Sequence, residues 1–328
     1  MTYREKRLTR VLKSRGMTAL IAMLAVVGAI AAYNAGAVTA VPGSKGLGLD
    51  SPNHWLTGAA SLNLAVLTYV VVAAMMVMVN RTFNLLRTLS LTFGAFFLLM
   101  VGALPMAMCQ FYGGTLLVVL MLAAVSVMFT TFNNPSLTRR VFLAFFLLTT
   151  GALTQYGFVV YLPILLVGCG QMRIFRTRTF LAAAVGVVTP YWIAWGFGWI
   201  TPATWHKPDF SSVFAAMSTA ETVHFLVTEA VTIALLLTLT AINMIKIYSY
   251  NLRTRAMNGL IIVISAATAL ISGIDFTNMP FYYPLLCCCT AFQLGHFIRI
   301  RTERRSGYIV TLSVAVIYMA LYIWRISI

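Results

Sequence analysis

Charged side chains are scarce in this chain of 328 residues: they make up 9% of it, against 60% hydrophobic residues. The mean hydropathy is +0.89. Soluble globular domains carry about 25% charged residues, so the composition excludes that class and indicates a polytopic membrane protein. Apolar segments and short connectors use up the chain. We therefore expect a basic leader, residues 1–16, and one integral membrane domain, residues 17–328.

Several catalytic and metal-binding patterns are missing from the sequence. It has no Walker loop, no G-x-S-x-G and no Cys/His zinc spacing, and its four histidines are too few for a membrane di-iron oxygenase. No apolar segment carries regularly spaced arginines, which excludes a voltage sensor. The five cysteines lie in or beside apolar segments, and three consecutive helical positions point about 100° apart and cannot clamp one metal. We expect small buried hydrophobes at Cys109, Cys169, Cys287, Cys288 and Cys289, and the sequence names no metal and no cofactor.

Acidic residues are also few, seven against 23 Lys and Arg, which gives a net charge of +16. The basic residues lie in short tracts between apolar runs, where they orient a chain in a membrane rather than bind nucleic acid. We expect a multi-pass protein of a bacterial inner membrane. Its basic tracts would lie against anionic lipid headgroups, at about 1 kcal/mol per basic side chain near the surface.

Apolar runs divide the chain into about eleven helical segments and predict an all-α fold. Gly, Pro, polar or basic residues separate them, and we find no internal repeat. The expected segments are 17–41, 55–79, 88–108, 112–131, 141–153, 157–170, 179–200, 222–245, 259–274, 284–298 and 308–324.

The central run, residues 141–172, has no charge. As one helix it would be about 48 Å long, against about 30 Å of hydrocarbon. A polar stretch, Thr149 to Gly157, interrupts it and predicts a short broken hairpin whose arms return to the same face, with Gln155 sheltered by protein. The hairpin places 20 of the 23 basic residues on one face, whereas a single crossing places 12 there. The positive-inside rule therefore predicts a cytoplasmic amino end and a periplasmic carboxyl end.

Five of the seven acids fall on or near the predicted outer face: Asp50, Asp209, Glu221, Glu229 and Asp275. Positive-inside selection alone explains this by removing Lys and Arg from outer loops and leaving acids there. Glu229 stands among apolar neighbours, about 12 Å along its helix from Glu221. Ionisable groups at such depth usually face an interior pocket or a partner. We therefore consider Asp50, Glu229 and Asp275 as candidate catalytic residues, able to act as a base or to hold a cation.

Polar and aromatic residues near these acids are candidates for binding a substrate. Glu221 and His224, three residues apart, share a helix face. Trp and Tyr near the outer face are most simply an interfacial belt, although a sugar platform is the alternative; they are Trp55, Trp199, Trp205, Tyr282, Tyr283 and Trp324. The candidate substrate-binding residues are His54, Gln155, Tyr156, Trp199, His206, Glu221 and His224.

The stretch TGALTQYGFVVYLPILLVGC (150–169), an arginine tract and FLAAAVGVVTPYWIAW (180–195) resemble an uncharacterised family of bacterial polytopic inner-membrane proteins, known mainly as a domain of unknown function. In that family a glycine-rich short hairpin precedes a basic tract and an apolar helix ending in Pro-Tyr, here Pro190–Tyr191. The layout is also similar to C-type membrane glycosyltransferases, which use polyprenyl-phosphate sugars and place a catalytic acid in the first outer loop, here Asp50. Asp50 stands alone rather than in an acidic pair, and the loop is short.

Three functions fit these observations. The first is a glycosyltransferase-like enzyme of envelope glycan or lipid-linked sugar assembly with an outward-facing acidic pocket. It would take a polyprenyl-phosphate-linked substrate. The second is a transporter or lipid flippase that uses the broken arms as a binding site and Glu229 as a proton-linked carboxylate. The third is a non-catalytic membrane subunit or scaffold. The sequence does not say whether the chain is an enzyme, and it names no protein partner.

Overall fold

A computed structural model describes residues 14–39, 41, 48–86, 91–201, 214, 217–247, 249–300 and 305–328. Over these ranges the chain is all α-helical, with twelve α-helices, three 3-10 helices and no strand. Seven of the helices are long and apolar enough to cross a membrane. The predicted polytopic α-helical fold is confirmed.

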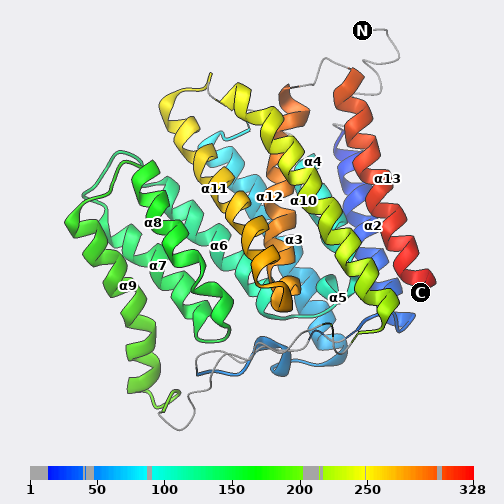
Figure 1. Cartoon of the computed structure of the whole chain (residues 1–328), viewed down its shortest axis with the longest axis horizontal. Helices are drawn as coiled ribbons and strands as arrows, with labels where there is room; N and C mark the ends of the chain where they lie inside the picture. Colours follow the sequence, from blue (N-terminus) through cyan, green and yellow to red (C-terminus); the bar gives the residue numbers. More distant parts are fainter. Residues whose placement is uncertain are drawn as a thin grey trace.

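The helices run side by side and alternate in direction along the chain (Figure 1). They are α2 (Arg15–Asn34), α3 (Gly58–Phe83), α4 (Thr92–Gly102), α5 (Pro105–Met108), α6 (Gly113–Phe129), α7 (Thr138–Ala152), α8 (Tyr161–Gln171), α9 (Thr177–Gly196), α10 (Thr219–Ile247), α11 (Leu252–Ile274), α12 (Met279–Ile300) and α13 (Arg305–Ser327). Counting α4 and α5 as one interrupted pass, this gives the eleven segments expected.

Two ends of this bundle differ in charge. We define the basic face as the end of the bundle at which α7, α9 and α11 begin and α8 and α12 end; it carries Arg139, Arg140, Arg173, Arg176, Arg178, Arg253, Arg255 and Arg299. The acidic face is the other end, where Asp50, Glu221 and Asp275 lie in the α2–α3 connector, the start of α10 and the α11–α12 turn.

The central uncharged run forms the predicted hairpin, with α7 and α8 as its arms. The backbone N–H of Asn133, before α7, donates to the carbonyl of Met172, after α8, at 2.9 Å. The run therefore enters and leaves on the basic face. The turn is shorter than expected, because Thr149 and Thr150 belong to α7 and donate to the carbonyls one turn earlier, at 2.9 and 2.8 Å. Satisfied in this way, threonines do not break a helix.

Other expected segments also have different bounds. Helix α11 begins at Leu252 rather than 259, and α12 at Met279 rather than 284, so parts of the expected connectors are helical. The first apolar helix ends at Asn34 rather than 41, because Gly36 adopts φ +71° and turns the chain. The third is interrupted at Leu104, which is extended before Pro105. Proline disfavours helical backbone in the residue before it and starts a helix well. The chain therefore bends between α4 and α5.

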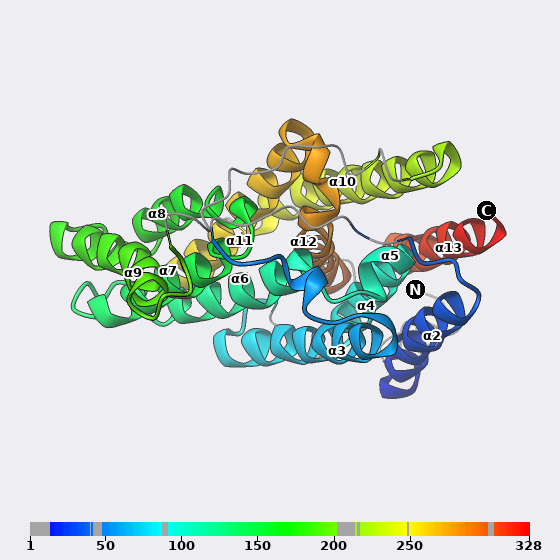
Figure 2. The same ribbon diagram turned by 90° about the horizontal axis from the view of Figure 1, so that it is seen from below.

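Helix α12 is the core of the bundle. Every side chain from Pro280 to Phe297 is buried, and α4, α6, α10 and α11 surround it (Figure 2). All five cysteines are buried and free, as expected. Tyr282 and Tyr283 are fully buried as well, so their assignment to an interfacial belt was wrong. They precede Pro284 on a helix whose whole circumference is apolar, and such a helix is buried.

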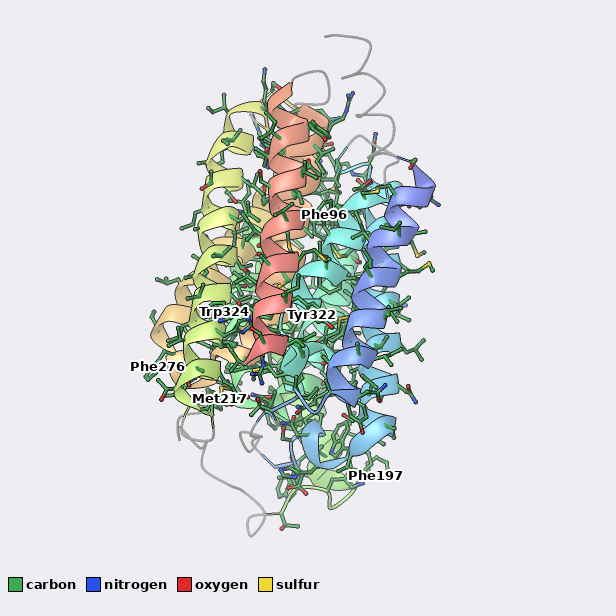
Figure 3. The ribbon with its side chains drawn as sticks, turned by 90° about the vertical axis from the view of Figure 1, so that its right-hand side faces the viewer. Phe96, Phe197, Met217, Phe276, Tyr322 and Trp324 are labelled. Carbon is green, nitrogen blue, oxygen red and sulfur yellow. The ribbon has the colours of Figure 1, made fainter. Side chains whose placement is uncertain are left out.

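The periphery consists of α9 at one end of the molecule and α2 with α13 at the other (Figure 2). Gly186 of α9 packs so closely on α7 that a Cβ there would lie 2.7 Å from the carbonyl oxygen of Phe142. The Tyr322 hydroxyl of α13 donates to the carbonyl of Gly28 on α2 at 2.7 Å. Tyr322 lies on the α2 side of α13 and Trp324 on its α10 side (Figure 3).

Candidate functional site

The Asp275 carboxylate accepts hydrogen bonds from three side-chain hydroxyls. It follows α11, and the Tyr156 hydroxyl at the tip of the hairpin donates to both of its oxygens, at 2.9 and 3.1 Å. The Tyr282 hydroxyl donates to Oδ2 at 2.8 Å and the Thr277 hydroxyl to Oδ1 at 3.1 Å. We name these four residues the Asp275 cradle. An ionised carboxylate only accepts hydrogen bonds, so three hydroxyl donors match it well.

The cradle lies where three chain reversals meet: the start of α6, the tip of the hairpin and the α11–α12 turn. The buried Gln155 amide donates to the Asn278 side-chain oxygen at 3.1 Å. Gly113 leaves room for this contact, since a Cβ there would lie 1.7 Å from Gln155 Oε1. Gln155 is thus sheltered by protein, as predicted. The Asn278 Nδ2 group is buried and has no partner in the described part of the chain.

Glu229 lies inside the bundle on α10, 1% exposed. It is ten residues from the start of a 29-residue helix, or about 15 Å along the axis. The Ser272 hydroxyl of α11 donates to its Oε1, whereas its Oε2 has no partner among the described side chains and backbone groups. No described Lys or Arg pairs with it, since the structure's ion pair joins Glu221 and Arg325.

Asp50 is exposed in the connector between α2 and α3. The preceding residue, Leu49, donates its N–H to the carbonyl of Leu153 at the hairpin tip, at 3.0 Å. The three candidate acids thus lie near the hairpin tip in different ways. Asp275 is hydrogen-bonded to the tip by Tyr156, and Glu229 is hydrogen-bonded to Ser272, one turn earlier on α11. Asp50 lies beside the tip because the preceding residue, Leu49, is bonded to it. Asp50 itself makes no hydrogen bond that the described residues show.

Glu221 and His224 share a helix face, as predicted, and that face packs on α13. The Glu221 carboxylate pairs with Arg325 and accepts from the Thr39 hydroxyl at 2.5 Å. His224 Nε2 lies 2.9 Å from the Leu321 carbonyl, with its ring edge-on to Trp324 at 5.0 Å. Both side chains hold α10 against α13.

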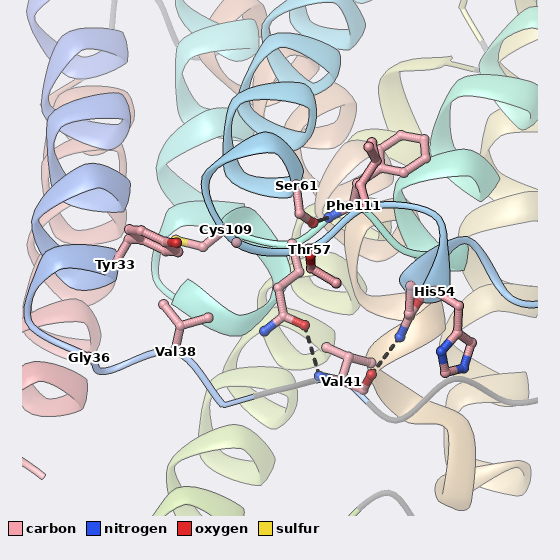
Figure 4. Close-up of a pocket in the computed structure, with 13 residues that line it drawn as sticks. Tyr33, Gly36, Val38, Val41, His54, Thr57, Ser61, Cys109 and Phe111 are labelled. Carbon is pink, nitrogen blue, oxygen red and sulfur yellow. Dashed lines mark hydrogen bonds between the residues drawn. The ribbon is translucent and has the colours of Figure 1, made fainter.

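His54 is exposed and lines a cavity of about 590 Å³ on the acidic face. Its walls come from the end of α2, the α2–α3 connector and the α5–α6 turn (Figure 4). Gln110 ties the walls together, because it accepts from the Val41 N–H at 2.9 Å and donates to the Thr39 carbonyl at 2.6 Å. The cavity is large enough for a sugar ring.

Trp199 lies beyond the end of α9, and the next residue, Ile200, packs with Leu153 of the hairpin tip and with Leu49. The Trp199 ring stacks on Phe197 at 5.4 Å and is exposed. A neighbouring apolar groove of about 690 Å³ is lined by Tyr191, Trp192 and Trp195. Exposed aromatic rings at a helix end are typical of a membrane interface. The last candidate, His206, lies outside the described residues, as do Trp205 and Asp209.

The sequence reading missed a buried polar group near the basic face. His296 Nε2 lies 2.8 Å from Asn258 Oδ1, and the Asn243 amide donates to the Gln293 side chain at 3.0 Å and to its carbonyl at 2.8 Å. All four residues are at most 1% exposed. The sequence signal that could have identified this group is the pair Gln293 and His296, two polar side chains one helical turn apart inside an apolar run.

The described residues contain no group of three or more His, Cys, Asp or Glu side chains that could hold a metal ion. No family model, no curated protein and no solved structure matches the chain. The Asp275 cradle and Glu229 are the features of the described residues whose chemistry points to a function.

Proposed function

We propose that the chain is a proton-coupled membrane carrier, a transporter or lipid flippase, in which Glu229 is the proton-linked carboxylate. The observation that carries this proposal is the placement of Glu229: inside the bundle, 1% exposed, with one serine partner and no described cation beside it. A charged carboxylate is costly at such depth. Glu229 therefore holds a proton in this arrangement and releases it when the helices admit water.

The geometry supports a link between this proton and a substrate site at the Asp275 cradle. Ser272, the partner of Glu229, lies one turn before Asp275 on α11. Asp275 in turn holds the hairpin tip through Tyr156. Carriers commonly bind their substrates where interrupted helices end inside the membrane. A change at Glu229 would shift the end of α11 and with it the hairpin tip.

The Asp275 cradle indicates the substrate class. Its carboxylate is organised by hydroxyl donors, and a substrate hydroxyl can replace the one from Tyr156, which is only half-buried. Hydroxyl-rich molecules, such as a sugar or a polyprenyl-phosphate-linked sugar, fit this chemistry. The exposed aromatic residues around Trp199 suit the interface at which a lipid-linked substrate would enter.

A thermal-shift titration tests the carrier. The detergent-solubilised chain is titrated with glucose, N-acetylglucosamine and a polyprenyl phosphate at pH 5.5 and pH 8. At least one of these probes should raise the Tm of the wild type, by an amount that differs between the two pH values. Glu229→Gln should remove the difference, and Asp275→Asn should remove the shift. A shift that is unchanged in Glu229→Gln would contradict the proposal.

A glycosyltransferase-like enzyme of envelope glycan assembly is the second candidate, and the position of Asp50 favours it. This carboxylate is exposed, free of described partners and beside the hairpin tip. It would act as the base that activates an acceptor hydroxyl. Transfer from a polyprenyl-phosphate sugar, followed by chromatography, should be lost in Asp50→Asn. Full activity of that variant would exclude Asp50 as the base, and absence of transfer by the wild type would exclude the enzyme. If neither Asp50→Asn nor Glu229→Gln changes the thermal shift or sugar transfer, and a stoichiometric partner co-purifies with the chain, the result favours a membrane scaffold.

A further inference from the structure

One face of α11 carries buried polar residues along most of its length: Asn258, Ser265, Thr268 and Ser272. Their spacings of 7, 3 and 4 residues keep them on one side of an α-helix. Each meets a polar or ionisable side chain of a neighbouring helix. Three of the pairs are hydrogen-bonded: Asn258 with His296, Thr268 with Tyr161 and Ser272 with Glu229. In the fourth pair Ser265 lies beside the Cys289 thiol of α12.

A fifth pair fills the longer interval between Asn258 and Ser265. Gln293 lies on α12 between Cys289 and His296, and Asn243 of α10 donates to its side chain. We call these five pairs the α11 ladder. From Asn258 to Ser272 the ladder rises about 21 Å, at 1.5 Å per residue. It therefore covers most of a hydrocarbon core about 30 Å thick.

The two ends of the ladder are ionisable. His296 lies toward the basic face and Glu229 toward the acidic face, and each is 1% exposed. His296 Nδ1, Asn243 Oδ1 and Glu229 Oε2 have no hydrogen-bond partner within the described residues. Buried polar atoms are rarely left unpaired, and ordered water is their usual partner when protein groups are not.

The steps between rungs fit single water molecules. Neighbouring rungs lie three or four residues apart along α11 or α12, so the axial rise between them is about 5 Å. One water that makes two hydrogen bonds of about 2.8 Å spans that distance. The hydroxyls of Ser265 and Thr268 donate to carbonyls of their own helix, at 2.7 and 2.8 Å. Ser265 has a lone pair available to accept from such a water, and Thr268, which already accepts from the Tyr161 hydroxyl at 3.1 Å, keeps one.

A metal cation fits this arrangement poorly, because it needs several oxygen ligands around one point. Here the polar groups are spread along the helix axis. Chains of acids and histidines within membrane helices instead characterise proton relays.

We propose that the α11 ladder conducts protons between the two faces. An imidazolium at His296 gives its proton to the adjacent water. Each rung then passes a proton to the next, and the Glu229 carboxylate takes up the last one; His296 is left neutral and nothing is consumed. This inference rests on the proposed carrier function, because the ladder is the route by which a proton would reach the Glu229 of that carrier.

Proton flux into liposomes tests the ladder. The purified full chain is reconstituted with entrapped pyranine, and a valinomycin potassium potential drives protons inward. Wild-type liposomes should acidify at least five times faster than empty ones. Thr268→Val and His296→Gln should lower the rate to that of empty liposomes. Thr238→Val is the matched control, since Thr238 is exposed on α10 and bonds only its own helix in the described structure. It should keep the wild-type rate.

The outcomes separate the ladder from the carrier. A wild-type rate equal to that of empty liposomes overturns the ladder, as does a full rate in both Thr268→Val and His296→Gln. Should either variant fail to fold, Ser265→Ala removes one hydroxyl with little loss of volume and should slow the flux severalfold. The thermal shifts with sugars and polyprenyl phosphate depend on Glu229 and Asp275 alone. They survive in Thr268→Val if the carrier is right, whatever the flux.

Discussion

The carboxylate of Glu221 and the guanidinium of Arg325 form an ion pair that joins the start of α10 to the end of α13. The same guanidinium donates to the Ala37 carbonyl at 3.1 Å and to the Thr39 hydroxyl at 2.8 Å. The end of the chain, the start of α10 and the segment after α2 are thus held at one point on the acidic face. The guanidinium side chain is only 8% exposed.

Removing one member of this pair should destabilise the bundle. Arg325→Gln leaves Glu221 without its cation, and Glu221→Gln does the converse; we expect each to cost about 1–3 kcal/mol, between the values for exposed and buried pairs. The double variant should cost less than the two single changes added together. Thermal unfolding of the four proteins in one detergent measures the coupling. Strict additivity would show that the two side chains do not interact.

The hairpin predicts which loops share a side of the membrane. Single cysteines replace Ser136 and Arg176, which flank the hairpin, or Thr57 and Ser218 near the acidic face; all four positions are exposed. The five native cysteines are buried and should react slowly. In intact cells, an impermeant maleimide should label Thr57→Cys and Ser218→Cys and spare the other two until the membrane is opened. Labelling of Ser136→Cys and Arg176→Cys from opposite sides would refute the hairpin.

Close packing of α9 on α7 depends on Gly186. An alanine methyl there would meet the Phe142 carbonyl oxygen at 2.7 Å, and backbone can yield only by moving a helix. We expect Gly186→Ala to cost about 1–3 kcal/mol, as overpacking usually does. Gly170→Ala on α8 is the matched control, because a Cβ there meets no atom within 4 Å. Thermal unfolding of the control should match or slightly exceed the wild type.

The Tyr156 hydroxyl should stabilise the hairpin tip more than the rest of the molecule. Tyr156→Phe removes the donor to Asp275 and keeps the ring; hydrogen bonds to charged groups contribute about 1.5–3 kcal/mol. Hydrogen exchange should therefore speed up in peptides that cover residues 153–158 and leave α12 unchanged. The control is Tyr322→Phe, which removes a bond between α2 and α13 far from the tip. Faster exchange at residues 153–158 in the control would contradict the assignment.

Much of this fold follows from hydropathy and charge. An uncharged run too long for one crossing and the excess of arginine on one face together predict the hairpin. The bounds of the hairpin were less predictable. Thr149 and Thr150 are typical of a turn in the sequence, but in the structure their hydroxyls donate to carbonyls of α7 and both residues are helical. Local composition does not reveal whether a polar side chain is satisfied by its own helix.

The site was predictable only in part. Helical periodicity predicts that Glu221 and His224 share a face and that Glu229 points elsewhere. It cannot predict that Arg325, more than a hundred residues later, pairs with Glu221. The partners of Asp275 come from the hairpin and from α12, so their meeting is a property of tertiary packing. His296 was missed because a single histidine near a basic tract gives no sign of its burial.

The contact between Tyr322 and Gly28 joins residues 294 positions apart. At about 5–20 residues per second, a ribosome needs roughly 15 to 60 s to make the intervening chain. During that interval α2 is already in the bilayer, with one flank open to lipid or to assisting proteins. Docking of α13 on α2 therefore follows synthesis of all the helices between them, and substitutions at this contact should reduce the yield of assembled protein before they alter anything the finished protein does.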